Sequence, residues 1–122
     1  MERIVSGVGV LDKSSALLAA VADGPCTLSE LSERTGTSRA TAHRLAVALE
    51  AHGLLRRKRD RRFALGLHLM SLGRTAAQQF PLAEAAADAL VGLRDTTGES
   101  VQLYVRDGAD RVCVAALESP HG

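Results

Sequence analysis

The chain has 122 residues, 46% of them hydrophobic, and a formal net charge of +1, which suits one domain or a small domain with part of another. No apolar run approaches the ~20 residues of a membrane-spanning helix, and the first ten residues lack the longer apolar core of a signal peptide. These features argue against a membrane protein and predict a cytoplasmic one.

The small net charge hides an asymmetry. Residues 1–66 contain 11 Lys and Arg against 7 Asp and Glu, a net charge of +4. Residues 67–122 contain 4 Lys and Arg against 7 Asp and Glu, a net charge of −3. A basic first part and an acidic second part indicate different roles.

The first predicted helix covers residues 9–22. Its apolar residues recur at helical spacing, and Asp23-Gly24-Pro25 ends it. We expect four side chains to face the core: Leu11, Leu17, Leu18 and Val21.

Two short helices joined by a glycine turn follow. Thr27 and Glu30 have the spacing of a capping box, which predicts a helix over residues 28–35. Gly36 supplies a left-handed residue that ends it, and Thr37 and Ser38 offer an N-cap for a helix over residues 39–52. A polar, basic second helix after such a turn is typical of a helix-turn-helix DNA-binding motif.

One face of this second helix is apolar, because Ala42, Leu45, Ala46 and Leu49 fall at i, i+3, i+4 and i+7. Ala40, Arg44 and Val47 point the opposite way, with His43 on the flank. The DNA contacts that we expect from this motif are Thr27, Thr37, Ser38, Arg39, Thr41, His43 and Arg44. Two alternatives stay open: Arg39 holds a phosphate, or His43 is partly buried against the turn.

A basic hairpin follows the second helix. Gly53 ends that helix, Leu54-Leu55 starts a strand, and Phe63-Ala64-Leu65 returns as its partner. Six of the seven residues from 56 to 62 are basic, which predicts a winged helix-turn-helix rather than a merely solvated hairpin. We expect DNA contacts from Arg57, Lys58, Arg59 and Arg61, with the last three at the tip.

A helix over residues 67–79 follows the predicted winged helix-turn-helix, here called the reading head. Its apolar stripe consists of Leu65, Leu69, Leu72 and Ala76, which we interpret as a dimerisation seam. The alternative is that this face packs back on its own winged helix. Phe80-Pro81 ends the helix.

The rest of the chain predicts another helix over residues 82–96, a strand from Val101, a turn at Asp107-Gly108 and a second, largely buried strand over residues 112–117. A two-stranded hairpin is marginal alone, so we interpret residues 81–122 as the start of an α/β effector-binding domain rather than a complete small domain. We expect the hairpin to be covered by another chain or poorly ordered, and this 122-residue form to bind no effector. The predicted fold class is mainly α with small β: a winged helix-turn-helix (1–66), a linker or dimerisation helix (67–80) and this fragment (81–122).

Catalytic signatures are missing from the sequence. None of the phosphate-loop, zinc-protease or nucleophile-elbow motifs occurs, so we expect no enzyme and no cofactor. Cys26 and Cys113 are far apart, which favours buried packing over a disulfide or a metal site. Two alternatives to a DNA-binding regulator remain: a metal-sensing winged-helix repressor that uses Cys26 and a histidine, and a winged-helix protein-interaction module.

The chain is similar to the IclR family of bacterial transcription regulators. The matching residues are Leu28–Leu31, Thr35-Gly36, Ser38–Leu45, Leu49, Gly53-Leu54, Phe63–Gly66, Thr97–Val101 and Val112–Ala115. Ala46 and Ala48 depart from the bulkier residues that the family often has. The segments Gly7–Lys13 and His43–Glu50 resemble more closely an actinobacterial subgroup, the NdgR/AreB type, which is associated with leucine and other amino-acid metabolism.

This resemblance implies a protein that binds a double-stranded DNA operator as a homodimer or higher homo-oligomer. It implies a linker helix that pairs two subunits and a C-terminal α/β domain that binds a small-molecule effector. The residues of the effector pocket would lie beyond Gly122 and are not transferred.

Overall fold

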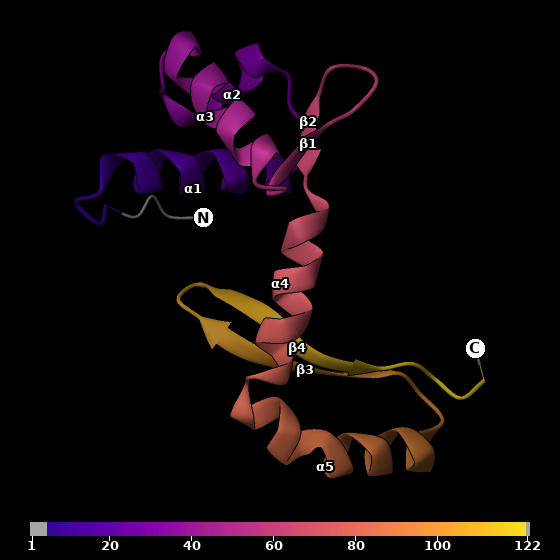
Figure 1. The fold of residues 1–122 in the computed structure, drawn as a ribbon. Coiled ribbons are helices and arrows are strands. Elements are labelled where there is room, and N and C mark those ends of the chain that lie inside the picture. The colour runs from indigo at the N-terminus through magenta and orange to yellow at the C-terminus, as the bar shows by residue number, and fades with distance from the viewer. Residues whose placement is uncertain (1–4, 122) are drawn as a thin grey trace. The chain divides into compact units, whose positions relative to one another are not determined.

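The computed structural model describes residues 5–121 and divides the chain into two compact units. The first unit ends at Ser71 and the second begins at Leu72, so the boundary falls inside a helix. Figure 1 shows the helices and the two short hairpins along the chain.

Three helices and a short hairpin form the first unit. The helices are α1 (Gly9–Ala22), α2 (Leu28–Thr35) and α3 (Arg39–Ala51), and the strands are β1 (Leu55–Arg57) and β2 (Phe63–Leu65). All five elements contribute to one small core, whose largest fully buried side chains are Phe63, Leu17, Leu31, Leu55 and Cys26. The predicted winged helix-turn-helix is confirmed.

The predicted inward face of α1 is wrong at one position. Leu17 and Val21 are buried, and Leu18 packs against the core, but Leu11 is 60% exposed. Burial in α1 is confined to its second half, so an apolar residue in the first turn lies outside the core although it fits the periodicity.

The helix-turn-helix is held by the predicted caps. Thr27 Oγ1 accepts a hydrogen bond from the Glu30 backbone N–H at 3.2 Å, and the Glu30 carboxylate accepts one from the Thr27 N–H at 3.3 Å. Gly36 ends α2 with φ = 66°, a left-handed conformation that glycine adopts without steric cost. Ser38 Oγ then caps α3 by accepting from the Thr41 N–H at 3.3 Å.

The hairpin of residues 55–65, here called the wing, is joined to the segment that leads into α2. β1 and β2 are antiparallel, with Leu55 opposite Leu65 and Arg57 opposite Phe63. On its other side, Phe63 exchanges backbone hydrogen bonds with Cys26: Phe63 N–H donates to Cys26 O at 2.7 Å, and Cys26 N–H donates to Phe63 O at 3.0 Å. The wing is therefore fixed to the helix-turn-helix by backbone as well as by side chains.

The second unit contains α5 (Pro81–Thr97) and an antiparallel hairpin of β3 (Val101–Asp107) and β4 (Asp110–Leu117), preceded by the end of α4 (Leu67–Gln78). The register shifts between Leu103 and Tyr104, which marks a bulge or irregularity. The expectation that residues 112–117 are largely buried is wrong: they are exposed or half-buried, and Val112 is 48% exposed. Within this unit, α5 packs on both strands of the hairpin.

Candidate nucleic-acid interface

The two faces of α3 differ as the sequence predicts. Ala42, Ala46 and Leu49 are buried in the core of the first unit. Arg44 is exposed on the opposite side, and Arg39 and His43 are exposed on the flanks of the buried stripe. Within the described residues, these three side chains take part in no ion pair and no side-chain hydrogen bond. They are therefore available to an external ligand.

The four hydroxyl residues of the predicted site are less available. Ser38 Oγ donates to Thr41 Oγ1 at 3.0 Å, and both lie at the start of α3. Thr27 Oγ1 donates to Glu30 Oε1 at 3.0 Å and also closes the capping box, so its hydroxyl is occupied within the protein. Thr37 is only 8% exposed, which leaves its side chain little surface to offer DNA.

The tip of the wing is a tight turn. Arg61 N–H donates to Lys58 O at 3.0 Å, and Lys58 N–H donates to Arg62 O at 2.8 Å. Asp60 Oδ1 accepts from the Arg62 N–H at 3.1 Å. Arg61 has φ = 69°, and among the described residues it is the only one other than glycine in this left-handed region. Such a conformation costs a non-glycine residue about 1–2 kcal/mol.

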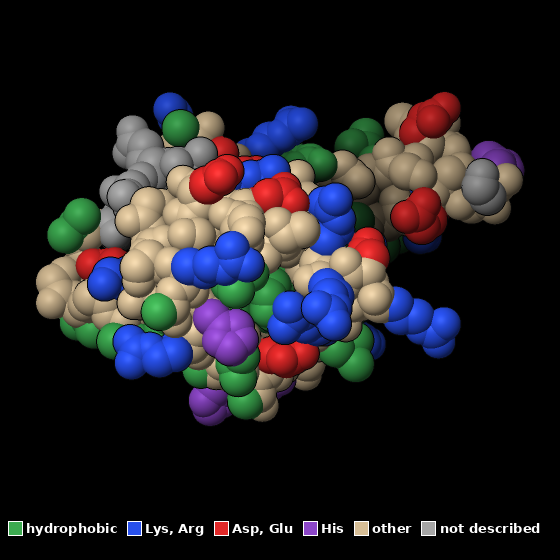
Figure 2. Space-filling view, turned by 90° about the horizontal axis from the view of Figure 1, so that it is seen from above, with side chains coloured by type: hydrophobic (Ala, Val, Ile, Leu, Met, Phe, Trp, Pro, Cys, Tyr) green, Lys and Arg blue, Asp and Glu red, His purple; other side chains and the backbone are tan. Residues whose placement is uncertain are grey.

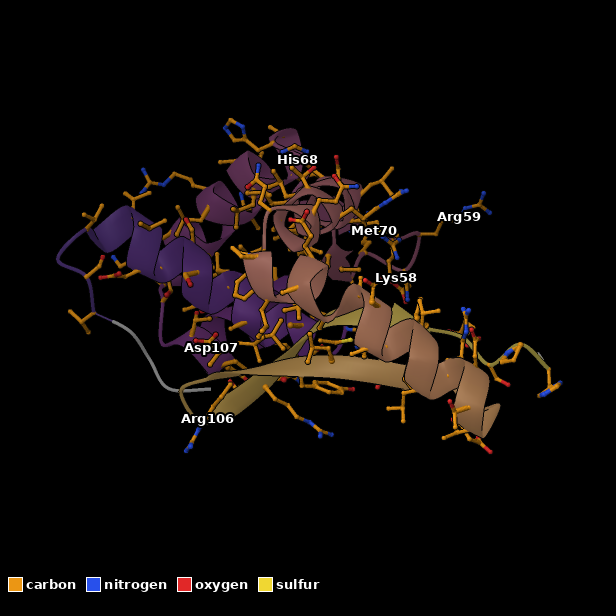
Figure 3. All side chains as sticks on the ribbon, turned by 90° about the horizontal axis from the view of Figure 1, so that it is seen from below. Lys58, Arg59, His68, Met70, Arg106 and Asp107 are labelled. Atoms are coloured by element: carbon orange, nitrogen blue, oxygen red, sulfur yellow. The ribbon has the colours of Figure 1, made fainter. Side chains whose placement is uncertain are left out.

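The six basic side chains of the wing fall into two sets. Arg57, Lys58 and Arg62 have partners within the protein: the Arg57 guanidinium lies 4.6 Å from the Phe63 ring centroid, and both Lys58 and Arg62 approach the Asp60 carboxylate. In the described structure Arg56, Arg59 and Arg61, here called the unpaired wing cations, have none. Figure 3 shows Arg59 extending outward from the turn.

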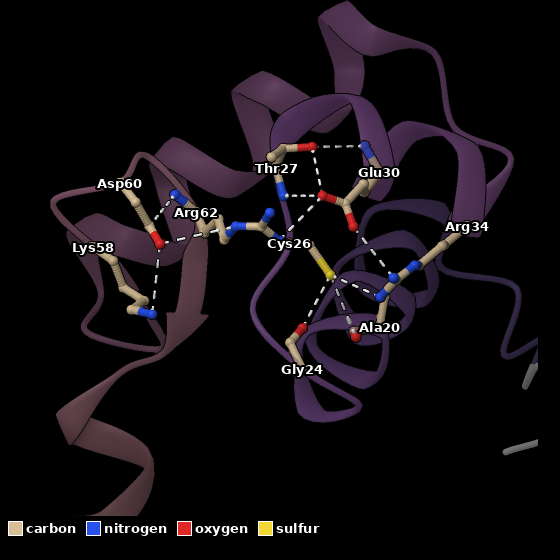
Figure 4. Close-up of polar contacts among 9 residues, drawn as sticks. All are labelled: Ala20, Gly24, Cys26, Thr27, Glu30, Arg34, Lys58, Asp60 and Arg62. Atoms are coloured by element: carbon tan, nitrogen blue, oxygen red, sulfur yellow. Dashed lines mark hydrogen bonds and ion pairs between the residues drawn. The ribbon is translucent and has the colours of Figure 1, made fainter.

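An ion pair connects the wing to α2. Arg62 Nη1 lies 3.5 Å from Glu30 Oε1, and Arg34 Nη2 lies 3.3 Å from Glu30 Oε2 (Figure 4). The hydrogen bonds from the Thr27 N–H and hydroxyl lower the pKa of the Glu30 carboxyl, and the charges of Arg62 and Arg34 add to this effect. The Glu30–Arg62 pair was not predicted from the sequence, because the two residues are remote in the chain and belong to different elements.

The charge pattern of the molecule is mixed rather than uniform. The view from above in Figure 2 shows Lys and Arg side chains distributed over this face, with carboxylates among them. In the wing and α2, the carboxylates of Asp60 and Glu30 are paired with basic side chains. The free positive charge is therefore carried by fewer residues than the sequence suggests.

Helix α4 has apolar side chains on more than one side. Leu69, Leu72 and Ala76 share one face by their spacing, and Leu67 and Met70 lie on the opposite face. None of the described residues of α4 is buried, and Leu72 is 49% exposed. Leu65, the remaining residue of the predicted seam, ends β2 and is also exposed.

Cys26, the proposed metal ligand of one alternative, lies in the core. Its Sγ donates to Gly24 O at 3.1 Å, and Arg34 Nη1 donates to the sulfur at 3.1 Å. Burial raises the pKa of the Cys26 thiol, although Arg34 opposes this. Across the described residues, no group of three or more His, Cys, Asp and Glu side chains could hold a metal ion, and no helix has the length and apolar content that a membrane crossing requires.

Comparison with known proteins identifies the reading head. Residues 10–59 match the IclR helix-turn-helix domain. The chain is 34% identical over 107 residues to the HTH-type transcriptional regulator KipR of Bacillus subtilis, covering 87% of this chain and 43% of KipR. It is 27% identical over 96 residues to the transcriptional repressor IclR of Escherichia coli, covering 78% of this chain and 35% of that repressor.

A solved structure gives the same result. The crystal structure of the Thermotoga maritima IclR superposes with a TM-score of 0.68 at 30% identity, over 92% of this chain and 46% of that one. The chain thus spans less than half the length of the relatives it matches. With the IclR helix-turn-helix domain, the capped turn and the wing all in place, the chain belongs to the IclR family of transcription regulators.

Proposed function

We propose that this chain contains the part of a transcription regulator that reads a double-stranded DNA operator. The observation that carries the proposal is the exposed side of α3, where Arg44 lies opposite the buried Ala42 and Leu49 and the exposed Arg39 and His43 flank them. A helix that is anchored by one face and presents arginines on the other suits the major groove, where arginine recognises guanine O6 and N7.

We propose different roles for the other candidate contacts. Ser38 and Thr41 lie at the start of α3, where hydroxyls and backbone N–H groups suit phosphate oxygens. Arg59 and Arg61, two of the three unpaired wing cations, suit phosphates or the minor groove. The burial of Thr37, and the occupied groups of Thr27, Arg57 and Lys58, make these four weaker candidates.

The proposal is tested by selecting bound fragments from genomic DNA and titrating the enriched sequence against an unrelated duplex. We expect discrimination between the two and a steep decrease of affinity with salt, since phosphate contacts release counterions. Equal, salt-insensitive binding of both duplexes would favour the alternative of a protein-interaction module.

We also propose that the regulator acts as a homodimer or higher homo-oligomer through the seam of Leu65, Leu69, Leu72 and Ala76. The exposure of Leu65, Leu72 and Ala76 supports this proposal, because an exposed apolar stripe on a helix is typical of an oligomer contact. The division of the chain into a reading head (1–66), a linker helix (67–80) and the start of an effector-binding domain (81–122) belongs to the same proposal.

For the whole protein we propose repression that responds to a small molecule, in the cytoplasm where the chromosome of a bacterium lies. The relative from Escherichia coli is a repressor by name, which supports the direction of regulation. The resemblance of Gly7–Lys13 and His43–Glu50 to the NdgR/AreB type supports an effector from amino-acid metabolism. Calorimetry of the full-length protein against amino acids and their keto acids tests this part separately.

A further inference from the structure

We propose that Glu30 is a positioning residue for DNA binding, which holds the wing at a fixed angle to the helix-turn-helix through Arg62. The inference rests on the proposed DNA-binding function. It assigns a role to an acidic residue inside a basic surface, where a carboxylate would otherwise only repel phosphate.

The geometry of Glu30 places it between the two DNA-binding parts. Its Oε1 accepts from the Thr27 backbone N–H at 3.3 Å and lies 3.5 Å from Arg62 Nη1. The same carboxylate therefore caps the start of α2 and contacts the wing. Because the capping box fixes the rotamer of Glu30, its carboxylate stays in one position instead of moving over the protein surface.

On the wing, the partner of Glu30 is Arg62, which Asp60 holds in place. Arg62 Nε lies 3.9 Å from Asp60 Oδ2, and the Arg62 N–H donates to Asp60 Oδ1, so the turn orients this side chain. The next residue, Phe63, carries the backbone bridge to Cys26. Backbone bridge and ion pair are thus adjacent, and together they constrain both the position and the tilt of the wing.

This arrangement gives the wing cations two roles: one positions the wing, and the others contact DNA. Arg62 is occupied by Glu30 and Asp60, whereas Arg59 and Arg61 are without partners in the described structure. A wing fixed by Arg62 brings Arg59 and Arg61 to the same place in every encounter with DNA. The ordering cost of binding is then lower, and a wrongly aligned duplex is rejected more strongly.

The first experiment needs no DNA. Amide hydrogen exchange is measured at Lys58 and Phe63, whose N–H groups donate to Arg62 O and Cys26 O. Glu30→Gln keeps the capping box, because glutamine serves at that position, but it removes the ion pair. We expect exchange at both amides to be roughly two- to five-fold faster in Glu30→Gln and in Arg62→Gln.

A matched control separates the two ion pairs of Glu30. Arg34→Gln removes the contact of Glu30 with Arg34 and leaves Arg62 in place. We expect exchange at Lys58 to be unchanged in this variant; Phe63 is not used for this comparison, because Arg34 also donates to Sγ of Cys26, the residue that accepts from the Phe63 N–H. Arg62→Lys should keep most of the protection at both amides. Unchanged exchange in Glu30→Gln would overturn the proposal.

The second experiment measures discrimination between the selected operator and an unrelated duplex. We expect discrimination to fall about two- to ten-fold in Glu30→Gln and in Arg62→Gln, and the double variant to be no worse than either single one. The slope of log K against log salt should not change in Arg62→Gln. A slope lower by about one would show that Arg62 holds a phosphate, and independent, additive losses would show that the pair does not act as a unit; either result overturns the proposal.

Failure of the proposed DNA-binding function and failure of the role proposed for Glu30 give different results. Absence of discrimination in the wild-type protein would contradict the proposed function, while hydrogen exchange would still show whether Glu30 holds the wing. Conversely, a protein that discriminates normally in Glu30→Gln would keep its proposed function and lose this inference.

Discussion

Gly66 lies directly against the backbone carbonyl of Gly53, so close that a Cβ at Gly66 would collide with the carbonyl oxygen and carbon. The Gly66 N–H donates to Leu54 O at 2.9 Å, and the His68 N–H donates to Gly53 O at 3.0 Å. The end of the wing and the start of α4 are thereby fastened to the end of α3, within the first unit.

Gly66→Ala should therefore destabilise the reading head. The atoms in the way are backbone atoms that cannot rotate aside, so we expect a loss of roughly 1–3 kcal/mol in the free energy of unfolding. Gly73→Ala is the control: nothing lies within 4 Å of its Cβ, and alanine favours the helix that contains it. Urea unfolding of both variants checks this, and equal stability would contradict the close approach.

Arg44→Ala should remove preference for particular bases rather than affinity for DNA in general. Arg44 is exposed on the face of α3 opposite the core, and one arginine–guanine contact contributes about 1–3 kcal/mol of discrimination. Titration of operator variants with single base changes measures this. Lys13→Ala, which removes an exposed charge from α1, should leave the ranking of variants intact; an intact ranking in Arg44→Ala would refute the base-reading role.

Arg61→Gly should stabilise the protein while weakening DNA binding. Glycine adopts φ near 69° without steric cost, so thermal unfolding should shift upward by the equivalent of several tenths to about 1 kcal/mol. The lost charge should reduce the salt slope of DNA binding by about one. Arg59→Gly should reduce the slope without the gain in stability, since Arg59 is not left-handed. A normal slope in Arg61→Gly would show that its side chain points away from DNA.

Acid should remove a stabilising contribution of Glu30. Its pKa is lowered in the folded state, mainly by the Thr27 N–H, so this carboxylate stabilises the fold above its unfolded pKa of about 4.5. The contribution is lost as the pH falls below 4.5 through the lower, folded value. Comparing the pH dependence of unfolding in wild type and Glu30→Gln isolates it, because Asp12 and Asp60, whose pKa values are also lowered, are common to both. Parallel curves would contradict the prediction.

Leu72→Arg should dissociate the proposed oligomer, because a charge in the centre of the proposed apolar seam is costly to bury. Met70→Arg, on the opposite face of α4, should leave the oligomer unchanged. Sedimentation equilibrium at tens of micromolar distinguishes them. A monomeric wild type would rule the seam out, and dissociation by Met70→Arg alone would place it on the opposite face of α4.

Local signals in the sequence predicted most of the fold. The bounds of α1 and α2, the capping box of Thr27 and Glu30, and the left-handed Gly36 all follow from neighbouring residues, and all are confirmed. The predicted burial was wrong at Leu11, which rested on periodicity, and over residues 112–117, which rested on a continuous apolar run. Both patterns report where apolar side chains lie and not whether anything packs on them.

The candidate site was harder to predict because pairing depends on contacts that are remote in sequence. A run of six basic residues gives no indication that Arg62 pairs with Glu30, or that Arg57 lies on Phe63. Nor does composition show that Thr37 is buried. These facts depend on how the wing docks on the segment before α2, which only the folded chain specifies.

The backbone bridge between Cys26 and Phe63 also bears on how the first unit folds during synthesis. α1, α2 and α3 precede the wing, so their mutual contacts can form while the remaining chain is still on the ribosome. The N–H and C=O of Cys26 gain their partners only when Phe63 emerges. Because Phe63 and Leu55 are among the largest buried side chains of the core that these helices share, the core itself is complete only once the wing has been synthesised.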